Sequence, residues 1–242
     1  MRKRRRTGFT LLELTIALAI LAVIAAIAIP RLVRGRLTAN EASAIATLRS
    51  IASAQAQLRS SAEIDTDSDG TGEYGYFGEL SGAQPLRIAA GGAPARGVPD
   101  SDELAPPILS SAFGEIAGGV VQRQGYDFQM WLPGATVAGR VPGLPEAAAG
   151  GAGATLPDPD NGEQLYGVYA WPTDHARSGV RCFFVNQERT LLQTSNRGLA
   201  AYGGALRTPA FDEAYAVAED MGSALRVGTP GGRQGTTWEP VR

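Results

Sequence analysis

The first thirty residues contain the strongest hydrophobic pattern in the chain. A basic stretch, MRKRRRTG, is followed by 21 residues, from 9 to 29, in which Glu13 is the only charged side chain. A helix of this length extends about 31 Å, which is enough for one crossing of a bilayer. Basic clusters of this kind stay on the cytoplasmic side, so the pattern predicts a single span with a cytoplasmic N-terminus.

Three ordinary explanations compete for this segment. A secretory signal peptide explains the basic start and the small residues Ala26 and Ala28, but the apolar stretch is longer than usual and contains an acid. A plain membrane anchor explains the length but neither Gly8 nor Glu13. Five leading basic residues argue against a buried helix of a soluble protein. Because a carboxylate in hydrocarbon costs about 2.5–3.5 kcal/mol, Glu13 calls for a partner or a function.

The helical pattern continues to about Ser61. An apolar or small stripe recurs at mostly three- and four-residue steps, at Leu37, Ala44, Ile45, Leu48, Ile51, Ala52, Gln55 and Leu58. We expect this stripe to pack on the chain's own globular head and the charged residues, Glu41 among them, to avoid it. Pro30 lacks a backbone donor and Gly35 loosens the chain, so a kink or a locally melted turn is expected there.

The later chain has the alternation of β-strands. In residues 125–134 the side chains of Tyr126, Phe128, Met130 and Leu132 share one face. Further strands are predicted within 164–172, 180–187 and 190–195, and together they form an antiparallel meander against the long helix. The Gly-, Ala- and Pro-rich stretch 133–163 is expected to be a surface excursion or partly disordered. Helical spacing after Thr208 predicts a helix to about Leu225.

Composition and charge refine this α+β prediction. The chain of 242 residues is 44% apolar and 19% charged, as in globular proteins, and its 31 Gly and 15 Pro predict many turns. Without the five basic residues of segment 1–8, 17 basic side chains face 24 acidic ones, a formal charge of −7. An acidic head argues against nucleic-acid binding.

The residues around Gly8 carry a family resemblance. Gly8-Phe9 followed by Thr10, Leu11, Leu12 and Glu13 resembles the class III signal of type IV pilins and of type II secretion pseudopilins, and Pro30 stands where that family often has a helix-kinking proline. The resemblance implies cleavage between Gly8 and Phe9 by a prepilin peptidase, followed by N-methylation of Phe9. It also implies a pilin-like fold, in which a long N-terminal helix packs on an antiparallel sheet.

This resemblance gives a domain plan and a function. We expect a leader at 1–8, a helix at 9–62 whose transmembrane and assembly part is 9–30, and an α+β head at 63–242. In a stack of helices, the Phe9 amine of one subunit can neutralise Glu13 of its neighbour and fix their register. The expected function is a structural subunit of a type IV pilus or secretion pseudopilus, with other subunits, the peptidase and an inner-membrane assembly platform as partners.

An alternative function stays open beside that one. The head is large for a major subunit, so the chain is also interpreted as a minor or tip pilin, or as a membrane-tethered module whose head binds a ligand. In either case it is expected to be a single-pass protein of the bacterial inner membrane, with its head in the periplasm or outside the cell. The sequence does not separate a pilus from a secretion pseudopilus or a DNA-uptake system.

One loop has the spacing of a calcium site. Asp65, Asp67, Asp69 and Gly70 match D-x-D-x-D-G, in which alternate carboxylates converge on one ion. The twelfth position of such a loop holds Tyr76 instead of an acid, so Glu73 or Glu79 would have to complete the ligand set. The other interpretation is a solvated acidic turn. DPDNGE at 158–163 is a second, weaker acidic loop, and no other cofactor is predicted.

No catalytic constellation is visible in the sequence. His175 is the only histidine and Cys182 the only cysteine, so the former is interpreted as a loop residue and the latter as a small buried hydrophobe. Trp131, Trp171 and Trp238 are expected in the core or an interface rather than in a sugar-binding face. We therefore predict that the chain is not an enzyme.

Overall fold

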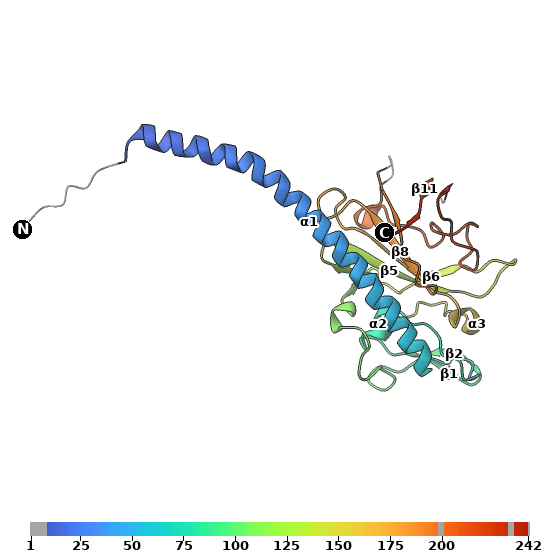
Figure 1. Ribbon diagram of the computed structural model, residues 1–242. Coiled ribbons are helices and arrows are strands. Elements are labelled where there is room, and N and C mark those ends of the chain that lie inside the picture. Colours follow the sequence, from blue (N-terminus) through green and yellow to red (C-terminus); the bar gives the residue numbers. More distant parts are fainter. Residues whose placement is uncertain (1–8, 198–200, 232–234, 242) are drawn as a thin grey trace, which may run out of the picture.

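A long N-terminal helix and a globular head make up the molecule (Figure 1). The computed structural model describes residues 9–197, 201–231 and 235–241. Thr10 caps helix α1, which runs from Leu11 to Ser61 and ends at Ala62 in a left-handed conformation. The first half of α1 projects away from the head, and the second half lies across it.

Short elements connect α1 to a large antiparallel sheet. In chain order the named elements after α1 are α2 (Phe77–Leu80), β1 (Arg87–Ala90), β2 (Ala93–Arg96), η1 (Ser111–Phe113), β3 (Ile116–Ala117), β4 (Val120–Arg123), β5 (Tyr126–Pro133), β6 (Gly143–Pro145), α3 (Pro159–Gly162), β7 (Gly167–Pro172), β8 (Cys182–Asn186), β9 (Leu192–Thr194), η2 (Gly204–Leu206), β10 (Pro230–Gly231), β11 (Thr236–Thr237) and β12 (Glu239–Pro240). The main sheet has eight strands in the order β12-β9-β8-β7-β5-β4-β3, with β6 paired to β5. This confirms the predicted helix-on-sheet α+β architecture.

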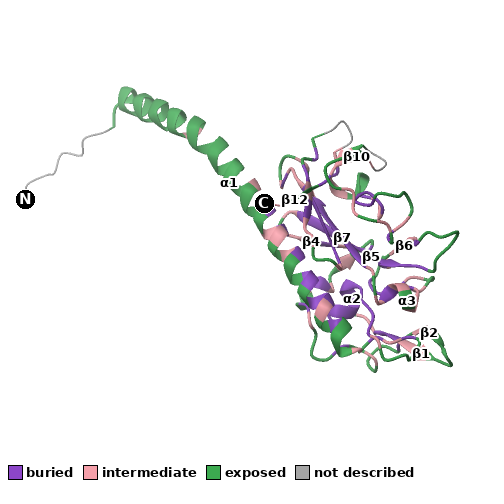
Figure 2. Ribbon diagram, turned by 45° about the vertical axis from the view of Figure 1, so that its right-hand side comes forward, coloured by how far each residue is buried: buried purple, intermediate pink, exposed green. Residues whose placement is uncertain are grey.

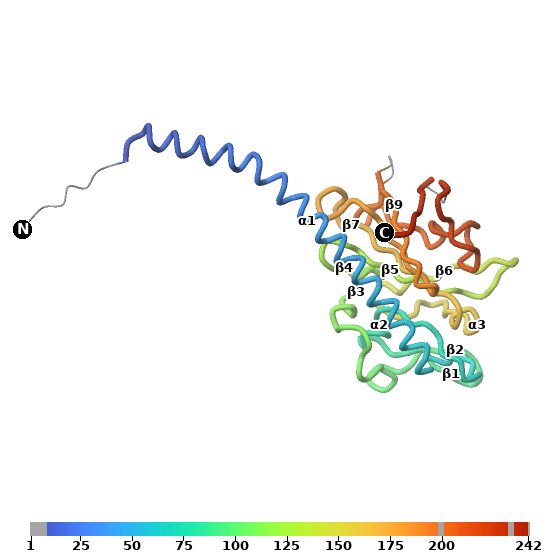
Figure 3. Tube along the Cα trace, viewed as in Figure 1, coloured from blue at the N-terminus to red at the C-terminus, as the bar shows by residue number. Residues whose placement is uncertain are grey.

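The helix does not break at Pro30. It is continuous from Leu11 to Ser61, with Pro30 inside it, and it curves gently over its length (Figure 3). Proline removes one hydrogen bond of the helix, but the remaining bonds on both sides hold a bent helix together. The expected melted turn is therefore wrong.

The central strands have both faces covered. On one face, Phe128, Met130 and Val168 pack against α1 residues such as Leu48 and Ile51, and all five are fully buried. On the other face a second buried cluster joins strand residues to the C-terminal segment, and it contains Val141, Tyr169, Trp171, Cys182, Phe184, Leu192, Tyr202, Ala214, Tyr215, Met221 and Trp238. β7 and β8 are buried along their whole length for this reason.

The predicted C-terminal helix is wrong. Its apolar residues Ala214, Tyr215 and Met221 are buried, but the segment is a series of turns with a bridge between Tyr215 and Leu225. Aspartates hold these turns, because Asp212 accepts a hydrogen bond from the backbone of Glu219 and Asp220 accepts from Gly222. Side chains of this type compete with the helical hydrogen-bond pattern. The 133–163 stretch also differs from a plain excursion, since it contributes β6 and α3.

Candidate assembly helix and acidic loop cluster

The N-terminus of α1 is closed by a reciprocal cap. The Thr10 hydroxyl accepts from the backbone N–H of Glu13 at 3.2 Å, and a Glu13 carboxylate oxygen accepts from the Thr10 N–H at 2.9 Å and hydroxyl at 2.8 Å. Glu13 is thus held beside the start of the helix, four residues from Phe9. The proposed cleavage partner Gly8 lies outside the described residues.

From Leu14 to Ile29 the surface of α1 is apolar apart from Thr15. None of its most apolar 18-residue window is buried, and the helix is long and apolar enough to cross a membrane. Phe9 is 73% exposed, and large exposed side chains continue along the helix at Leu11, Leu12, Leu14, Ile16, Leu18, Ile20, Leu21, Val23, Ile24, Ile27, Ile29, Leu32 and Val33. Figure 2 shows this contrast with the buried face of the second half. An apolar surface of this size marks a membrane or subunit interface.

A charged contact fixes where α1 meets the head. Glu41 accepts from the backbone N–H groups of Val180 and Arg181, both at 3.1 Å, and forms an ion pair with the Arg181 guanidinium at 2.7 Å. Asn40 donates to the Ser178 carbonyl at 2.7 Å. Burial raises the pKa of Glu41, but the hydrogen bonds and charge of Arg181 outweigh it and leave the pKa lowered.

This contact corrects one expectation about the stripe. Glu41 is 8% exposed and faces the head, whereas we expected it to avoid the packed side. Its position was readable from spacing, since it stands four residues after Leu37 and three before Ala44. Its charge argued against burial, because a carboxylate is buried only when it has a partner. Here the partner is Arg181, which lies 140 residues further along the chain and could not be identified from spacing.

Gln55 ties the C-terminal part of α1 to the segment that follows the helix. Its amide donates to the carbonyl of Gly75 at 2.6 Å and accepts from the N–H of the same residue at 3.0 Å. Tyr74, Tyr76 and Phe77 around it are buried, as expected for residues that seat the acidic loop on the head. The side chain fixes the loop because both its polar groups are satisfied by one backbone unit.

Two acidic loops distant in sequence come together beside the end of α1. Oxygen atoms of Asp65, Asp67 and Asp69 lie within 4.8 Å of one another, and so do those of Asp67, Asp160 and Glu163. Desolvation and the charges of the neighbouring aspartates raise the pKa of Asp67. Desolvation and the same cluster raise the pKa of Glu163, one of whose carboxylate oxygens is buried with no hydrogen-bond partner among the described residues. Carboxylate oxygens in this number are ligands of the type that Ca²⁺ takes.

Glu73, which we expected to complete the calcium ligands, is engaged elsewhere. One oxygen accepts from the backbone and hydroxyl of Thr66, and the other pairs with Arg87 at 2.7 Å. Arg87 also pairs with Glu79 at 3.0 Å and donates to the carbonyl of Tyr74. The side chains of Arg87, Glu73 and Glu79, which form these two ion pairs, are each at most 1% exposed. Asp160 and Glu163 take the place in the acidic cluster that we had given to Glu73.

A further buried carboxylate closes the short helix α2. Glu146 accepts from the N–H groups of Phe77 at 3.2 Å, Gly78 at 2.8 Å and Gly151 at 2.9 Å. Burial raises the pKa of Glu146 to about 8, although these three donors lower it. Nothing in the sequence pattern pointed to this role, which depends on chain segments almost 70 residues apart.

The remaining candidates lie where the sequence placed them. His175 contacts the carbonyl of Asn196 at 2.9 Å in a loop, and Cys182 is fully buried in β8. Trp171 and Trp238 are fully buried, and Trp131 is half-buried against Phe211. These surroundings are those of structural residues.

Parts of the chain are similar to known proteins. The prokaryotic N-terminal methylation motif matches residues 3–29. The chain is also similar to the type IV major pilin protein PilA of Myxococcus xanthus (strain DK1622), with 35% identity over 86 residues. That similarity covers 36% of this chain and spans 38% of the length of the relative. No solved structure matches the chain significantly.

The motif and the partial match to a major pilin make the chain similar to type IV pilins, as the residues around Gly8 predicted. The long apolar helix packed on an antiparallel sheet is a pilin-like architecture, and the apolar first half fits membrane anchoring. The cleavage position and the roles of Glu13 and Pro30 stay predictions.

Proposed function

We propose that this chain is a structural filament subunit that assembles through the first half of α1. The observation that carries the proposal is the exposed apolar helix, which has the methylation motif at its start and no buried residue in its most apolar window among the described residues. Side chains this apolar are stable either in lipid or among the same helices of neighbouring subunits. When a subunit moves from the membrane into a filament, its apolar helix exchanges lipid for the helices of neighbouring subunits.

Glu13 would supply the register of that assembly. After cleavage between Gly8 and Phe9, the new amine stands four residues from Glu13 on the same helix. In the isolated chain the Glu13 carboxylate is satisfied by the cap at Thr10. In a bundle of helices it would instead meet the Phe9 amine of a neighbour, an ion pair whose attraction strengthens as water is excluded.

The same proposal names partners and a location. A prepilin peptidase would cut the leader, and an inner-membrane platform would add the mature subunit to either a type IV pilus or a type II secretion pseudopilus. The chain would cross the inner membrane once, with residues 1–8 cytoplasmic and the head periplasmic until assembly. A minor or tip subunit is the second candidate, and the large head that follows α1 favours it.

Mass spectrometry of the membrane-extracted chain tests the processing step. We expect an N-terminus at Phe9 carrying one methyl group. The variant Gly8→Val should stay uncut, because its branched side chain stands at the expected cleavage position, whereas Gly8→Ala should still be cut and serves as the control. A mature N-terminus at Ile29 would instead identify a secretory signal peptide and refute the pilin assignment.

Abundance in filaments tests the structural role. Sheared filaments should contain the processed chain as a main component if it forms the shaft, and as a trace if it is a tip subunit. Complete absence from filaments, with normal processing, would leave only the membrane-tethered binding module.

We also propose that the acidic loops bind calcium. Asp67 would be the shared ligand, with Asp65 and Asp69 from its own loop and Asp160 and Glu163 from the other. A cation there would offset the repulsion that raises the pKa of Asp67. It would also tie together two loops that are separated by more than 80 residues of sequence.

Thermal unfolding of the detergent-solubilised chain tests this proposal. Millimolar calcium should raise the melting temperature by the linkage between binding and folding, and EDTA should reverse it. The gain should disappear in Asp67→Asn and persist in Asp100→Asn, an exposed acid outside the cluster. A parent chain that does not respond to calcium would identify the loops as solvated turns.

A further inference from the structure

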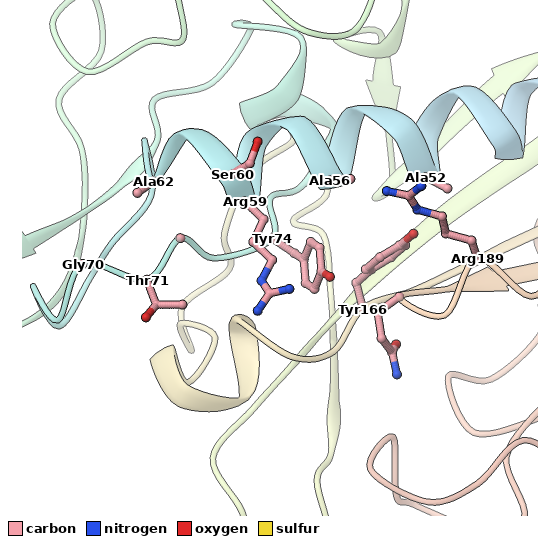
Figure 4. Close-up of a pocket in the computed structure, with 12 residues that line it drawn as sticks. Ala52, Ala56, Arg59, Ser60, Ala62, Gly70, Thr71, Tyr74, Tyr166 and Arg189 are labelled. Carbon is pink, nitrogen blue, oxygen red and sulfur yellow. The ribbon is translucent and has the colours of Figure 1, made fainter.

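A cavity of about 430 Å³ lies under the C-terminal end of α1. Its walls come from three places in the chain: the last turns of α1, the loop that follows them, and the segments that flank β7 and β8 (Figure 4). The lining includes Arg59, Thr71, Tyr74, Tyr166, Gln187 and Arg189. This volume is within the range of small-molecule sites.

Two arginines flank the cavity without a carboxylate partner among the described residues. Figure 4 shows Tyr74 and Tyr166 side by side, with Arg59 beyond one ring and Arg189 beyond the other. The Arg59 guanidinium lies over the Tyr74 ring, 5.7 Å from the ring centroid. This contact uses one face of the guanidinium and leaves the N–H groups at its edge available. The cavity therefore has a cation at each end of an aromatic pair.

Two residues that line the same cavity have buried polar atoms without a hydrogen-bond partner among the described residues. Tyr166 is only 1% exposed, and its hydroxyl has no hydrogen-bond partner among the described residues. The side-chain oxygen of Gln187 is buried and unpartnered in the same sense. Burial raises the pKa of Tyr166, so the hydroxyl stays protonated and is a donor. Buried groups of this kind normally have a partner, and an acceptor group of a ligand in the cavity can supply one for the Tyr166 hydroxyl.

We propose that this cavity binds a small dicarboxylate. One carboxylate would accept hydrogen bonds from Arg59, and the other from Arg189 and the Tyr166 hydroxyl. Planar guanidinium groups match carboxylates in a bidentate manner, and one cation at each end favours a ligand with two acidic groups over a ligand with one. The site is separate from the apolar half of α1, so it does not depend on filament assembly.

The T-shaped contact between the two tyrosines pre-forms the floor of the site. Their ring centroids are 4.7 Å apart with an interplanar angle of 61°. Tyr74 and Tyr166 are both buried, so binding does not have to order them. The arginines are exposed and are the groups that a ligand would fix.

Calorimetric titration of the full chain in detergent micelles with succinate tests the proposal. We expect saturable binding that is weakened about tenfold or more in Arg59→Gln and in Arg189→Gln, because each change removes one charge-assisted contact. Tyr166→Phe should weaken binding without unfolding the chain, since only an unpartnered hydroxyl is lost. Arg49→Gln, an exposed arginine of the same helix outside the cavity, is the matched control and should bind as the parent does.

Butyrate, with one carboxylate, distinguishes a two-cation site from general attraction of anions. It should bind more weakly than succinate to the parent chain and about as weakly as succinate binds to the single arginine variants. The proposal is overturned if succinate does not bind, if butyrate binds equally well, or if the arginine variants bind as Arg49→Gln does. It is also overturned if the chain self-associates and Arg59→Gln abolishes this, since the cavity would then receive a second copy.

Discussion

Glu41 is the residue whose chemistry depends most on distant parts of the chain. Its carboxylate satisfies two backbone N–H groups and one guanidinium at the edge of β8. The side chain is 10% exposed and Arg181 is 37% exposed, so the pair is screened only in part. The contact orients α1 against the sheet at the point where the helix leaves the head.

We expect Glu41→Gln to lower the free energy of unfolding by about 1.5–3 kcal/mol at pH 7, the range for hydrogen bonds to a charged group. The pKa of Glu41 is lower in the folded chain, so its contribution is complete above the unfolded value and is lost as pH falls through the folded value. The difference between parent and variant should therefore shrink from pH 7 to pH 3.5. Urea unfolding followed by tryptophan fluorescence measures it.

Glu63→Gln is the control for this prediction, because Glu63 is exposed just beyond the end of α1. It should change the free energy of unfolding by less than about 0.5 kcal/mol at either pH. A loss in Glu41→Gln that is the same at pH 7 and pH 3.5 would contradict an ionic role for Glu41.

At the scale of elements, periodicity predicted most of the fold. The stripe from Ala44 to Leu58 is the buried face of α1, and the alternating residues Tyr126, Phe128, Met130 and Leu132 are all fully buried in β5. The buried residues recur about every 3.6 residues in the helix and every second residue in the strand, as the geometry of each element requires. Periodicity of that kind is local information, which a sequence contains in full.

The same reasoning failed where long-range contacts decide the outcome. The segment after Thr208 has helical spacing, but its apolar residues cover the second face of the sheet from turns that aspartates hold. For the acidic cluster, the sequence identified Asp65, Asp67 and Asp69 and, as a separate and weaker acidic loop, residues 158–163. It gave no reason to bring Asp160 and Glu163 beside Asp67. The donors to Glu146 at the start of α2 are also non-local, 68 and 69 residues away.

The Arg87 ion pairs join the segment after the acidic loop to β1. Arg87→Met should reduce the free energy of unfolding by about 3–5 kcal/mol, because Glu73 and Glu79 would stay buried without a cation. Arg177→Met removes an exposed pair, with side chains 85% and 56% exposed, and should cost at most about 1 kcal/mol. Denaturant unfolding of the two variants gives the comparison. Similar small losses in both would show that the buried bridges contribute no more than a surface pair.

The whole molecule divides into two halves with different surroundings. The head is closed on both faces of its sheet, whereas the first half of α1 is exposed along nearly all its length and has none of the core residues found among the described residues. One continuous helix connects them, so a force or a rotation applied to the apolar half reaches the head through the Glu41 and Gln55 contacts. In a filament, the position of each head would follow from the packing of the helices.

Glu13 is where assembly of whole molecules can be tested. Glu13→Val makes the span more apolar, so membrane insertion and cleavage after Gly8 should stay largely intact. Incorporation into filaments should fall sharply, because the Phe9 amine of a neighbour would be buried without its carboxylate. The measurement is the fraction of processed chain in sheared filaments against the fraction left in membranes.

The cap at Thr10 provides the control that this experiment needs. Glu13 also stabilises the start of α1, and Thr10→Val removes that cap while keeping the carboxylate. A cap costs about 1 kcal/mol, so Thr10→Val should assemble nearly as well as the parent. If both variants fail equally, the cap rather than the intersubunit pair explains the defect. If Glu13→Val assembles normally, pairing with the Phe9 amine does not drive assembly.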